Sequence, residues 1–240
     1  MTRNLSVQAK VSTLALAIAM VVGPTPAAAQ FVGTIDSSSG IDTVNSNNSN
    51  LIITGQQAVI NWTATDTPTS GVIAFLPDGS SATFNGSSDF AVLNRVTPGT
   101  AGNAIYMGGN ITSLIGGETV GGTVFFYSPN GIIIGQNAVI NVGSLGLTTL
   151  PISDDGSGNW MTGFGTANPR VTFGQATDAN SFIRTNAVSD GSINAHGAGS
   201  YVAMVAPRVE HHGVIRTDTA AAPSVRTTPL CWTIGATIAT

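Results

Sequence analysis

One ten-residue segment occurs twice in this chain of 240 residues, and the repeat constrains the fold more than any other feature. Residues 52–61 read IITGQQAVIN and residues 132–141 read IIIGQNAVIN, so eight of ten positions are identical. A glycine, a short apolar run and a closing Asn are typical of a strand that ends in a polar turn. The chain therefore repeats one strand-and-turn unit.

Weaker copies of the same pattern indicate the length of the unit. They occur at residues 122–127, 191–195 and 213–217, and the last two are separated by about 20 residues. A unit of about 20 residues, four of which span the separation of the two long copies, is typical of a solenoid of stacked parallel strands. We therefore predict that Asn61 and Asn141 end equivalent strands at matching corners.

Composition favours an all-β fold and excludes a helical bundle. Gly, Ser, Thr and Asn number 29, 22, 30 and 18, whereas Lys, Glu, Gln and Arg together number sixteen. The abundant four are poor helix formers and favour turns. A β-sandwich is the alternative all-β fold, but its strands alternate apolar and polar residues, whereas residues 51–53 and 132–134 are uninterrupted apolar triplets.

The first 29 residues have the pattern of a secretory signal peptide. Arg3 and Lys10 form a basic start, an apolar stretch of about a dozen residues follows, and Ala-Ala-Ala at 27–29 offers a cleavage site. The apolar stretch is too short to cross a membrane. The alternative to a signal peptide is a buried helix at the N-terminus of the fold. We expect cleavage between Ala29 and Gln30 and export from the cytoplasm.

Cleavage leaves an acidic chain with 6 basic residues, all Arg, against 12 acidic ones, a formal charge of −6. Because no basic cluster remains, nucleic acid and anionic membrane surfaces are not expected as partners. The single cysteine, Cys231, cannot form an internal disulfide. Sheet hydrogen bonds and a continuous apolar core must therefore hold the exported chain together.

Four stretches depart from the regular pattern. Residues 31–45 are the natural cap for the first edge of a parallel solenoid. Residues 62–110 and 151–170 hold clustered Pro, Gly and Asp turns and are expected to be hairpins or loops that leave the main body. Residues 219–240 lack the pattern and form an atypical tail, which indicates a truncation or a lost reading frame. The main domain is expected at 30–218.

Two further segments resemble a known family. Residues 91–96 read AVLNRV, and residues 124–132, some thirty residues later, read VFFYSPNGI. With the glycine and apolar run of residues 135–141, they are similar to the haemagglutination activity domain of two-partner-secretion exoproteins. This is the N-terminal secretion domain of filamentous haemagglutinins and high-molecular-weight adhesins. The resemblance covers roughly residues 31–218, including residues 199–209.

The resemblance implies a right-handed parallel β-helix that acts as a secretion signal. Such proteins cross the inner membrane by the general export machinery and are then recognised by periplasmic domains of a dedicated outer-membrane barrel transporter. The positions that carry over to this chain are Asn94, Arg95, Ser128, Pro129, Asn130, Gly131 and Ile132. The implied product is an adhesin, secreted or held on the outer membrane of a Gram-negative bacterium, whose contacts with host or neighbouring cells lie further downstream.

The residue types of the second segment, residues 124–132, also predict a turn without reference to the family. Pro129 fixes φ, and both Asn130 and Gly131 can adopt φ > 0, so a tight turn between two strands is expected. These residues could therefore form only a corner of the fold. Ser128 stands where the family motif has Asn, and its shorter side chain still offers an acceptor that can cap the turn.

Arg95 has two interpretations. It is one of six arginines in the mature chain, so it could be a contact for the transporter. Alternatively it pairs inside the protein with Asp89 or Glu118, which is the common role of a half-buried arginine.

An enzyme is the main alternative class, because parallel β-helices also host polysaccharide lyases and hydrolases. Their sites need clustered carboxylates, often with Lys, Arg or bound Ca²⁺. Here only Asp154 and Asp155 adjoin, in a Gly/Ser turn expected at a solvated hairpin tip. His211 and His212 would face opposite sides of a strand, and His196 stands apart. We therefore expect no catalytic residues, no metal site and no cofactor.

A free-standing module that binds carbohydrate or cell surfaces is the third alternative. Exposed aromatic residues on one face would support it. Trp62, Tyr106 and Trp160 lie in the stretches expected to leave the main body, where they could also serve to pack loops against it.

Overall fold

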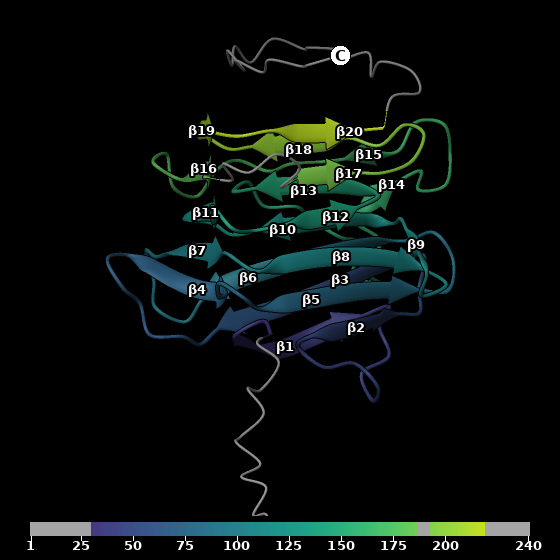
Figure 1. The fold of residues 1–240 in the computed structure, drawn as a ribbon, viewed down its shortest axis with the longest axis horizontal. Helices are drawn as coiled ribbons and strands as arrows, with labels where there is room; N and C mark the ends of the chain where they lie inside the picture. The colour runs from purple at the N-terminus through teal and green to yellow at the C-terminus, as the bar shows by residue number, and fades with distance from the viewer. Residues whose placement is uncertain (1–29, 187–192, 219–240) are drawn as a thin grey trace, which may run out of the picture.

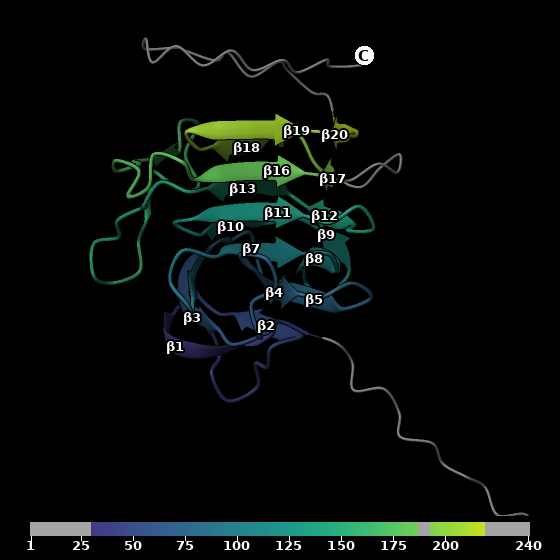
Figure 2. The ribbon, with the colours of Figure 1, turned by 90° about the vertical axis from the view of Figure 1, so that its left-hand side faces the viewer.

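The computed structural model describes residues 30–186 and 193–218, and these residues form an all-β fold without helices. Its body consists of three sheets of mainly parallel strands, and the chain passes through the three sheets in rotation. Figures 1 and 2 show the strands stacked from the N-terminal ones at the bottom to the C-terminal ones at the top. One passage through all three sheets is called a round below.

The six-stranded sheet contains the longest strands. Its order is β1 (Gly33–Ser39), β3 (Gln57–Ala64), β6 (Ala91–Pro98), β10 (Thr123–Tyr127), β13 (Ser144–Thr148) and β18 (Val202–Val205). All neighbours are parallel except β1, which is antiparallel to β3. Strand β1 thus covers the first edge of the sheet, where a cap was expected from residues 31–45.

The other two sheets are parallel along their main path. The five-stranded sheet runs β19 (Arg208–His211), β16 (Phe182–Thr185), β11 (Gly131–Ile134), β7 (Ala104–Met107) and β4 (Val72–Leu76). The seven-stranded sheet runs β2 (Asn50–Ile53), β5 (Ser81–Gly86), β8 (Asn110–Ile115), β12 (Ile140–Val142), β17 (Ile193–Ala195) and β20 (Ile215–Thr217), with β9 (Thr119–Val120) antiparallel to β8. The first round is therefore β2, β3 and β4.

One apolar core lies between the three sheets. In-register pairing stacks like side chains along it. The seven-stranded sheet aligns the isoleucines Ile111, Ile140, Ile193 and Ile215. The five-stranded sheet aligns the fully buried Ile105, Ile132 and Ile183. Each such stack removes apolar surface from water, which stabilises the fold by about 25 cal/mol per Å².

Phe31 closes the core at its N-terminal end. Its fully buried ring stacks on Phe75, with centroids 4.7 Å apart, and lies 5.4 Å from the ring of Trp62. Its backbone N–H donates to the carbonyl of Asn48 at 3.1 Å, and the N–H of Val32 donates to the carbonyl of Phe75 at 2.8 Å. The cap is thus bound to the body both by packing and by hydrogen bonds.

The predicted unit of about 20 residues is too short for the early rounds. Backbone pairing joins Ile111 to Ile140, so the round that separates them is almost half as long again as predicted. The pairing of Ile193 with Ile215 does confirm that the two late copies of the pattern are one round apart. Corner loops of different lengths connect the strands, so no single period describes the chain.

The two copies of the ten-residue segment do not occupy equivalent places, which corrects the prediction of matching corners. The first runs from β2 into β3, whereas the second runs from β11 into β12. Asn61 lies within β3, in the six-stranded sheet, and Asn141 lies within β12, in the seven-stranded sheet. The separation of the copies thus combines two rounds with part of a third, and the repeat reflects a shared strand–turn–strand pattern.

Residues 62–110 do not leave the main body, contrary to expectation. They contain the end of β3 and all of β4 to β7, which belong to the three sheets. Their turn residues make the corners between sheets: Pro77, Asp78 and Gly79 lie between β4 and β5, and Pro98 ends β6. Proline is tolerated there because a strand end needs no further backbone donor.

Residues 149–181, which connect β13 to β16, do leave the three sheets, and we call them the excursion. The expectation for residues 151–170 is therefore confirmed. The excursion carries an antiparallel pair, β14 (Met161–Thr162) and β15 (Arg170–Val171). It covers part of the outer face of the six-stranded sheet and forms a second apolar cluster there, whose members include Trp160 and Phe125 (Figure 2).

Contact between Trp160 and Phe125 fixes the excursion on the sheet. Their ring centroids are 5.0 Å apart, and both side chains are almost fully buried. Gly146, on the neighbouring strand β13, provides the room, because a Cβ at this position would collide with the Phe125 ring. An aromatic pair of this kind adds about 0.5–1.5 kcal/mol beyond the area that it buries.

The expected signal peptide, with its cleavage site after Ala29, lies outside the described residues, as does the tail at 219–240. Within the described residues, no helix has the length and apolar character needed to cross a bilayer.

Replacing Phe31 by Ala tests the cap. We expect the free energy of unfolding to fall by about 3–5 kcal/mol, because the change leaves a cavity at the end of the core. Urea unfolding followed by tryptophan fluorescence measures it. Val44→Ala, at a side chain that is 87% exposed, is the control and should change stability by less than about 0.5 kcal/mol. Equal stability of the two variants would contradict this role of Phe31.

Candidate functional site

The two segments that carry the family resemblance lie side by side. Strands β6 and β10 are parallel neighbours, and their register places Asn94 opposite Phe126 and Arg95 opposite Tyr127. Residues 128–130 then turn the chain from β10 into β11. Segments some thirty residues apart in the sequence are thus adjacent in the sheet. Successive side chains along each strand point to opposite faces, so each residue of the two segments has to be placed separately.

Asn94 points into the core and is fully buried. Its Oδ1 accepts a hydrogen bond from Trp62 Nε1 at 3.1 Å, and its Nδ2 donates to the carbonyl oxygen of Phe125 at 3.2 Å. A buried amide whose two ends are both bonded ties β3, β6 and β10 together. The side chain offers no surface to a partner, so its contribution to any site is to hold these strands in place.

Ser128 begins the corner between β10 and β11 and is also fully buried. Its backbone N–H donates to the carbonyl of Thr148 at 3.1 Å. Its hydroxyl has no hydrogen-bond partner among the described residues, so the acceptor that Ser128 offers is not used to cap the turn. An unpaired buried hydroxyl costs about 1–3 kcal/mol of stability.

Pro129 and Asn130 are the accessible part of this corner, and each is half-buried. The segment does form the predicted tight turn between two strands. Asn130 does not adopt φ > 0, contrary to expectation. In the described part of the chain, Ser70 is the only non-glycine residue with positive φ.

Gly131 and Ile132 follow the corner and are buried. A Cβ on Gly131 would lie 3.0 Å from the carbonyl oxygen of Phe182 and 3.1 Å from the Cβ of Ala104, so glycine is needed for close approach of three strands. Ile132 belongs to the isoleucine stack of the core. Both residues shape the corner without being exposed on it.

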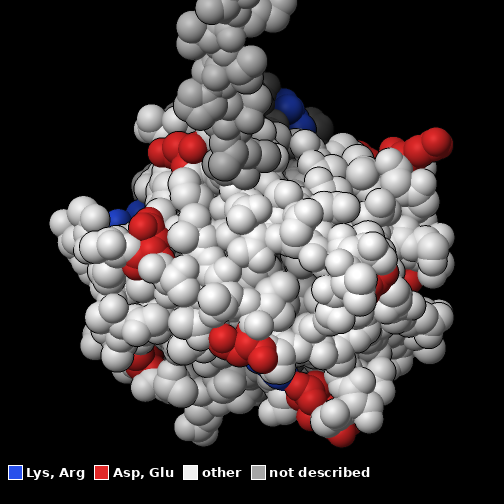
Figure 3. Space-filling model, turned by 90° about the horizontal axis from the view of Figure 1, so that it is seen from below, with Lys and Arg blue, Asp and Glu red and all other residues white. Residues whose placement is uncertain are grey.

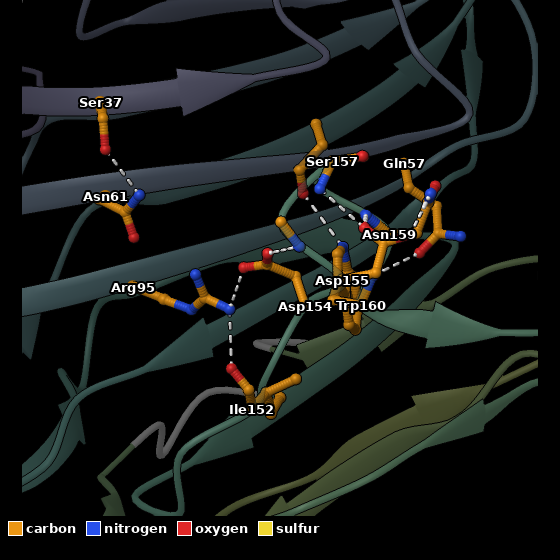
Figure 4. A network of polar contacts seen from close by, with 12 residues as sticks. Ser37, Gln57, Asn61, Arg95, Ile152, Asp154, Asp155, Ser157, Asn159 and Trp160 are labelled. Atoms are coloured by element: carbon orange, nitrogen blue, oxygen red, sulfur yellow. Dashed lines mark hydrogen bonds and ion pairs between the residues drawn. The ribbon is translucent and has the colours of Figure 1, made fainter.

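Arg95 points outward and is held by the excursion (Figure 4). Its Nη2 lies 2.7 Å from Asp154 Oδ2 and donates to the carbonyl of Ile152 at 2.8 Å. Pairing inside the protein is therefore confirmed, but the expected partners Asp89 and Glu118 are wrong. The side chains of Arg95 and Asp154 remain 21% and 19% exposed, so this pair lies at the surface.

Gln57 anchors the excursion and was not recognised from the sequence. Its Oε1 accepts hydrogen bonds from the backbone N–H groups of Trp160 at 3.0 Å and Met161 at 2.8 Å, and its Nε2 donates to the carbonyl of Met161 at 3.0 Å. Trp160 Nε1 donates to the carbonyl of Ala58 at 3.0 Å. A signal existed, because Gln57 is one of two positions at which the ten-residue copies differ, with Asn137 in the other copy.

A polar groove of about 190 Å³ lies beside the Arg95–Asp154 pair. Its lining comes from β1, β3, β6 and the excursion: Ser37, Ser38, Ser39, Val59, Asn61, Arg95, Asp154, Gly156 and Gly158. Asn61 Nδ2 donates to Ser37 Oγ at 2.8 Å on one side of it (Figure 4). Hydroxyl, amide and guanidinium groups suit this surface to hydrogen bonding with a polar partner.

Asp154, which lines the groove, and its neighbour Asp155 both form contacts within the protein. The hydrogen bond from Arg95 holds the pKa of Asp154 below its usual range, and the backbone N–H of Gly156 adds to this effect. Asp155 closes its own turn by accepting from Asn159 and Ser157, which also lowers its pKa. Both residues were expected at a solvated hairpin tip, but only Asp155 is exposed, whereas Asp154 is half-buried. Because both carboxyl groups stay ionised near neutral pH, neither suits a general acid.

His211 and His212 are neighbours at the end of β19, in the five-stranded sheet, whereas His196 follows β17 of the seven-stranded sheet. His211 Nδ1 lies 2.6 Å from Thr185 Oγ1, His196 Nδ1 lies 3.6 Å from Asp218 Oδ2, and His212 lines a shallow depression of about 410 Å³ together with Tyr106. Burial lowers the pKa of His211. Within residues 30–186 and 193–218, no three His, Cys, Asp or Glu side chains gather as metal ligands.

Two of the three aromatic residues considered as a carbohydrate platform are buried. Trp62 lies within β3 and faces the core, so its expected place in a loop is wrong. Trp160 does lie in the excursion and packs it onto the sheet. Tyr106 lies within β7, and its hydroxyl donates to Asp78 Oδ1 at 2.8 Å. Burial, followed by the Asp78 contact, raises the pKa of Tyr106 to about 12.

Figure 3 views the molecule from its N-terminal end and shows acidic side chains dispersed over that face, with few basic ones between them. Neither a scan against models of protein families nor a search of curated proteins finds a match to the chain.

The two buried polar residues of the motif should respond differently to alanine. Asn94→Ala leaves Trp62 Nε1 and the Phe125 carbonyl unpaired, so we expect unfolding to become easier by about 2–4 kcal/mol. Ser128→Ala removes a hydroxyl that bonds to nothing among the described residues, so stability should stay the same or rise by about 1 kcal/mol. Urea unfolding of both variants measures this. A larger loss for Ser128→Ala than for Asn94→Ala would show that these two environments are misassigned.

The Arg95–Asp154 pair should make stability depend on pH. Because the pKa of Asp154 is lowered on folding, the pair stabilises the protein above the unfolded pKa, near 3.8, and loses this effect as pH falls through the folded value. At pH 7, Asp154→Asn should cost about 1 kcal/mol. Thermal unfolding from pH 7 down to pH 2 should show the difference from wild type shrinking towards zero. A difference that does not change with pH would argue against the ion pair.

Proposed function

We propose that this chain is the secretion-signal domain of a two-partner-secretion exoprotein of the filamentous haemagglutinin type. In this proposal its rounds form a right-handed parallel β-helix, with β1 and Phe31 as the N-terminal cap. The rotation of the chain through three parallel sheets around one core supports this architecture.

The observation that carries the proposal is the register between β6 and β10. It aligns Arg95 with Tyr127, which directly precedes the corner at residues 128–130. Two motifs defined by sequence alone are therefore neighbours in space, as a single recognition surface requires. Their accessible members are Arg95, Pro129 and Asn130.

The start of the fold also supports export. The predicted cleavage leaves Gln30 as the first residue; Gln30 is exposed, whereas the next residue, Phe31, is fully buried. A cut at this position would remove the apolar leader without touching the cap. The domain would thus pass through the general export machinery and fold its cap from the new N-terminus.

In the proposed pathway the periplasmic domains of an outer-membrane barrel transporter bind the folded or folding domain. The exoprotein then reaches the cell surface or the medium of a Gram-negative bacterium. The role of this domain is binding rather than catalysis, and adhesion to other cells belongs to regions downstream of it.

Export in a Gram-negative host, with and without the partner barrel transporter, tests the proposal. Wild-type chain should reach the medium only when the transporter is present. Arg95→Ala combined with Asn130→Ala should lower export at least about tenfold, because two accessible contacts are lost. Immunoblotting of medium and periplasm measures the ratio, and unfolding curves establish that the variant is folded.

A matched control uses the same residue types away from the motif. Asn168 and Arg170 are exposed on the excursion, so Asn168→Ala with Arg170→Ala should export like wild type. Export that does not need the transporter, or that falls equally in both double variants, would exclude the proposed function.

A further inference from the structure

Two arginines and a phenylalanine form a cluster on the outer face of the five-stranded sheet. The guanidinium carbons of Arg184 and Arg208 lie 5.3 Å and 5.2 Å from the centroid of the Phe182 ring. Glu210 bridges the two arginines: its Oε2 is 2.7 Å from Arg184 Nε, and its Oε1 is 3.3 Å from Arg208 Nε. These four residues are called the arginine cluster.

The arginine cluster adjoins the corner at residues 128–130. Strands β11, β16 and β19 pair so that Gly131, Phe182 and Arg208 follow one another across the sheet. A Cβ on Gly131 would lie 3.2 Å from Cε1 of Phe182, so the ring rests against this glycine. The arginine cluster therefore begins beside Gly131, the residue that directly follows the accessible corner.

Charge distinguishes this cluster from the rest of the molecule. Residues 30–218 contain five Arg, no Lys and 12 acidic residues, and two of the five arginines flank this one ring. With Glu210 the cluster carries a net charge of +1. The arginine side chains are 37% and 57% exposed, so the positive charge is accessible to a partner.

Each guanidinium group still has donors available. Arg184 and Arg208 both contact Glu210 through Nε, and their terminal nitrogens have no partner in the part of the chain that the structure describes. Guanidinium groups bind both oxygens of a carboxylate in a fixed geometry. Stacking on Phe182 limits the rotamers of both side chains, so binding would cost less conformational entropy.

We propose that the arginine cluster binds carboxylate side chains of a protein partner. The assignment of that partner rests on the proposed function: it is the periplasmic part of the transporter, which would contact Pro129, Asn130 and the arginine cluster together. Because the charges are exposed, this contact weakens as salt concentration rises.

A short polyglutamate peptide tests the chemistry without the transporter. The full mature chain should bind polyglutamate at low salt, bind it less at high salt, and not bind polyglutamine of equal length. Arg184→Gln with Arg208→Gln should raise the dissociation constant about tenfold, whereas Arg170→Gln, at an exposed arginine elsewhere, should leave it unchanged. Calorimetry measures the constants, and circular dichroism checks folding. No binding by wild type, or equal binding by the double variant, would overturn the proposal.

Transporter-dependent export separates this proposal from the function on which it rests. If wild-type export requires the transporter, the Arg184→Gln/Arg208→Gln variant should export several-fold less. Unchanged export of this variant would overturn the partner assignment and leave the secretion function standing. If wild-type export ignores the transporter, the secretion function fails, and the peptide experiment still decides whether the arginine cluster binds carboxylates.

Discussion

In-register hydrogen bonding between strands of successive rounds is the constraint on which this structure depends. A strand such as β10 is bonded to β6 on one edge and β13 on the other, so each strand position is repeated above and below by the neighbouring rounds. Side chains of similar character therefore stack, as the isoleucines of the five- and seven-stranded sheets do. A large polar side chain in the core is costly unless its own bonds are satisfied, and Asn94 meets that condition through Trp62 and Phe125.

The same constraint explains which parts of the fold could be predicted from the sequence. The strand pattern, the turn residues and the scarcity of helix formers suffice for an all-β fold with parallel strands, and the Gly/Ser/Asp-rich stretch at 151–170 marks the excursion. The length of a round could not be predicted, because hydrogen bonding fixes the strands and leaves the corner loops free to vary. Near-identical segments at 52–61 and 132–141 therefore fall on different sides of the body.

The candidate site was predictable at the level of segments and not of individual side chains. Alternation along β6 puts Asn94 inside and Arg95 outside. The sequence does not show which set of alternate residues faces the core, because Leu93, on the outer face, is apolar and is buried by the excursion. Asp154, the partner of Arg95, lies far along the chain in that excursion, and no periodic pattern in the sequence predicts this contact. The side chain of Ser128 is able to cap a turn, yet the backbone turns without its hydroxyl. What remains accessible is a small surface whose geometry the buried members of the motif maintain.

The central claim is that the two motif segments are aligned side by side, and a distance measurement tests it most directly. Nitroxide labels placed at Arg95 and Tyr127, in a chain whose only cysteine is replaced by Cys231→Ser, would sit on adjacent strands whose backbones are about 4.8 Å apart. Strong dipolar broadening of the electron paramagnetic resonance spectrum is the predicted result, by comparison with chains that carry either label alone. A spectrum of two non-interacting labels at Arg95 and Tyr127 would contradict the alignment, and with it the proposed recognition surface.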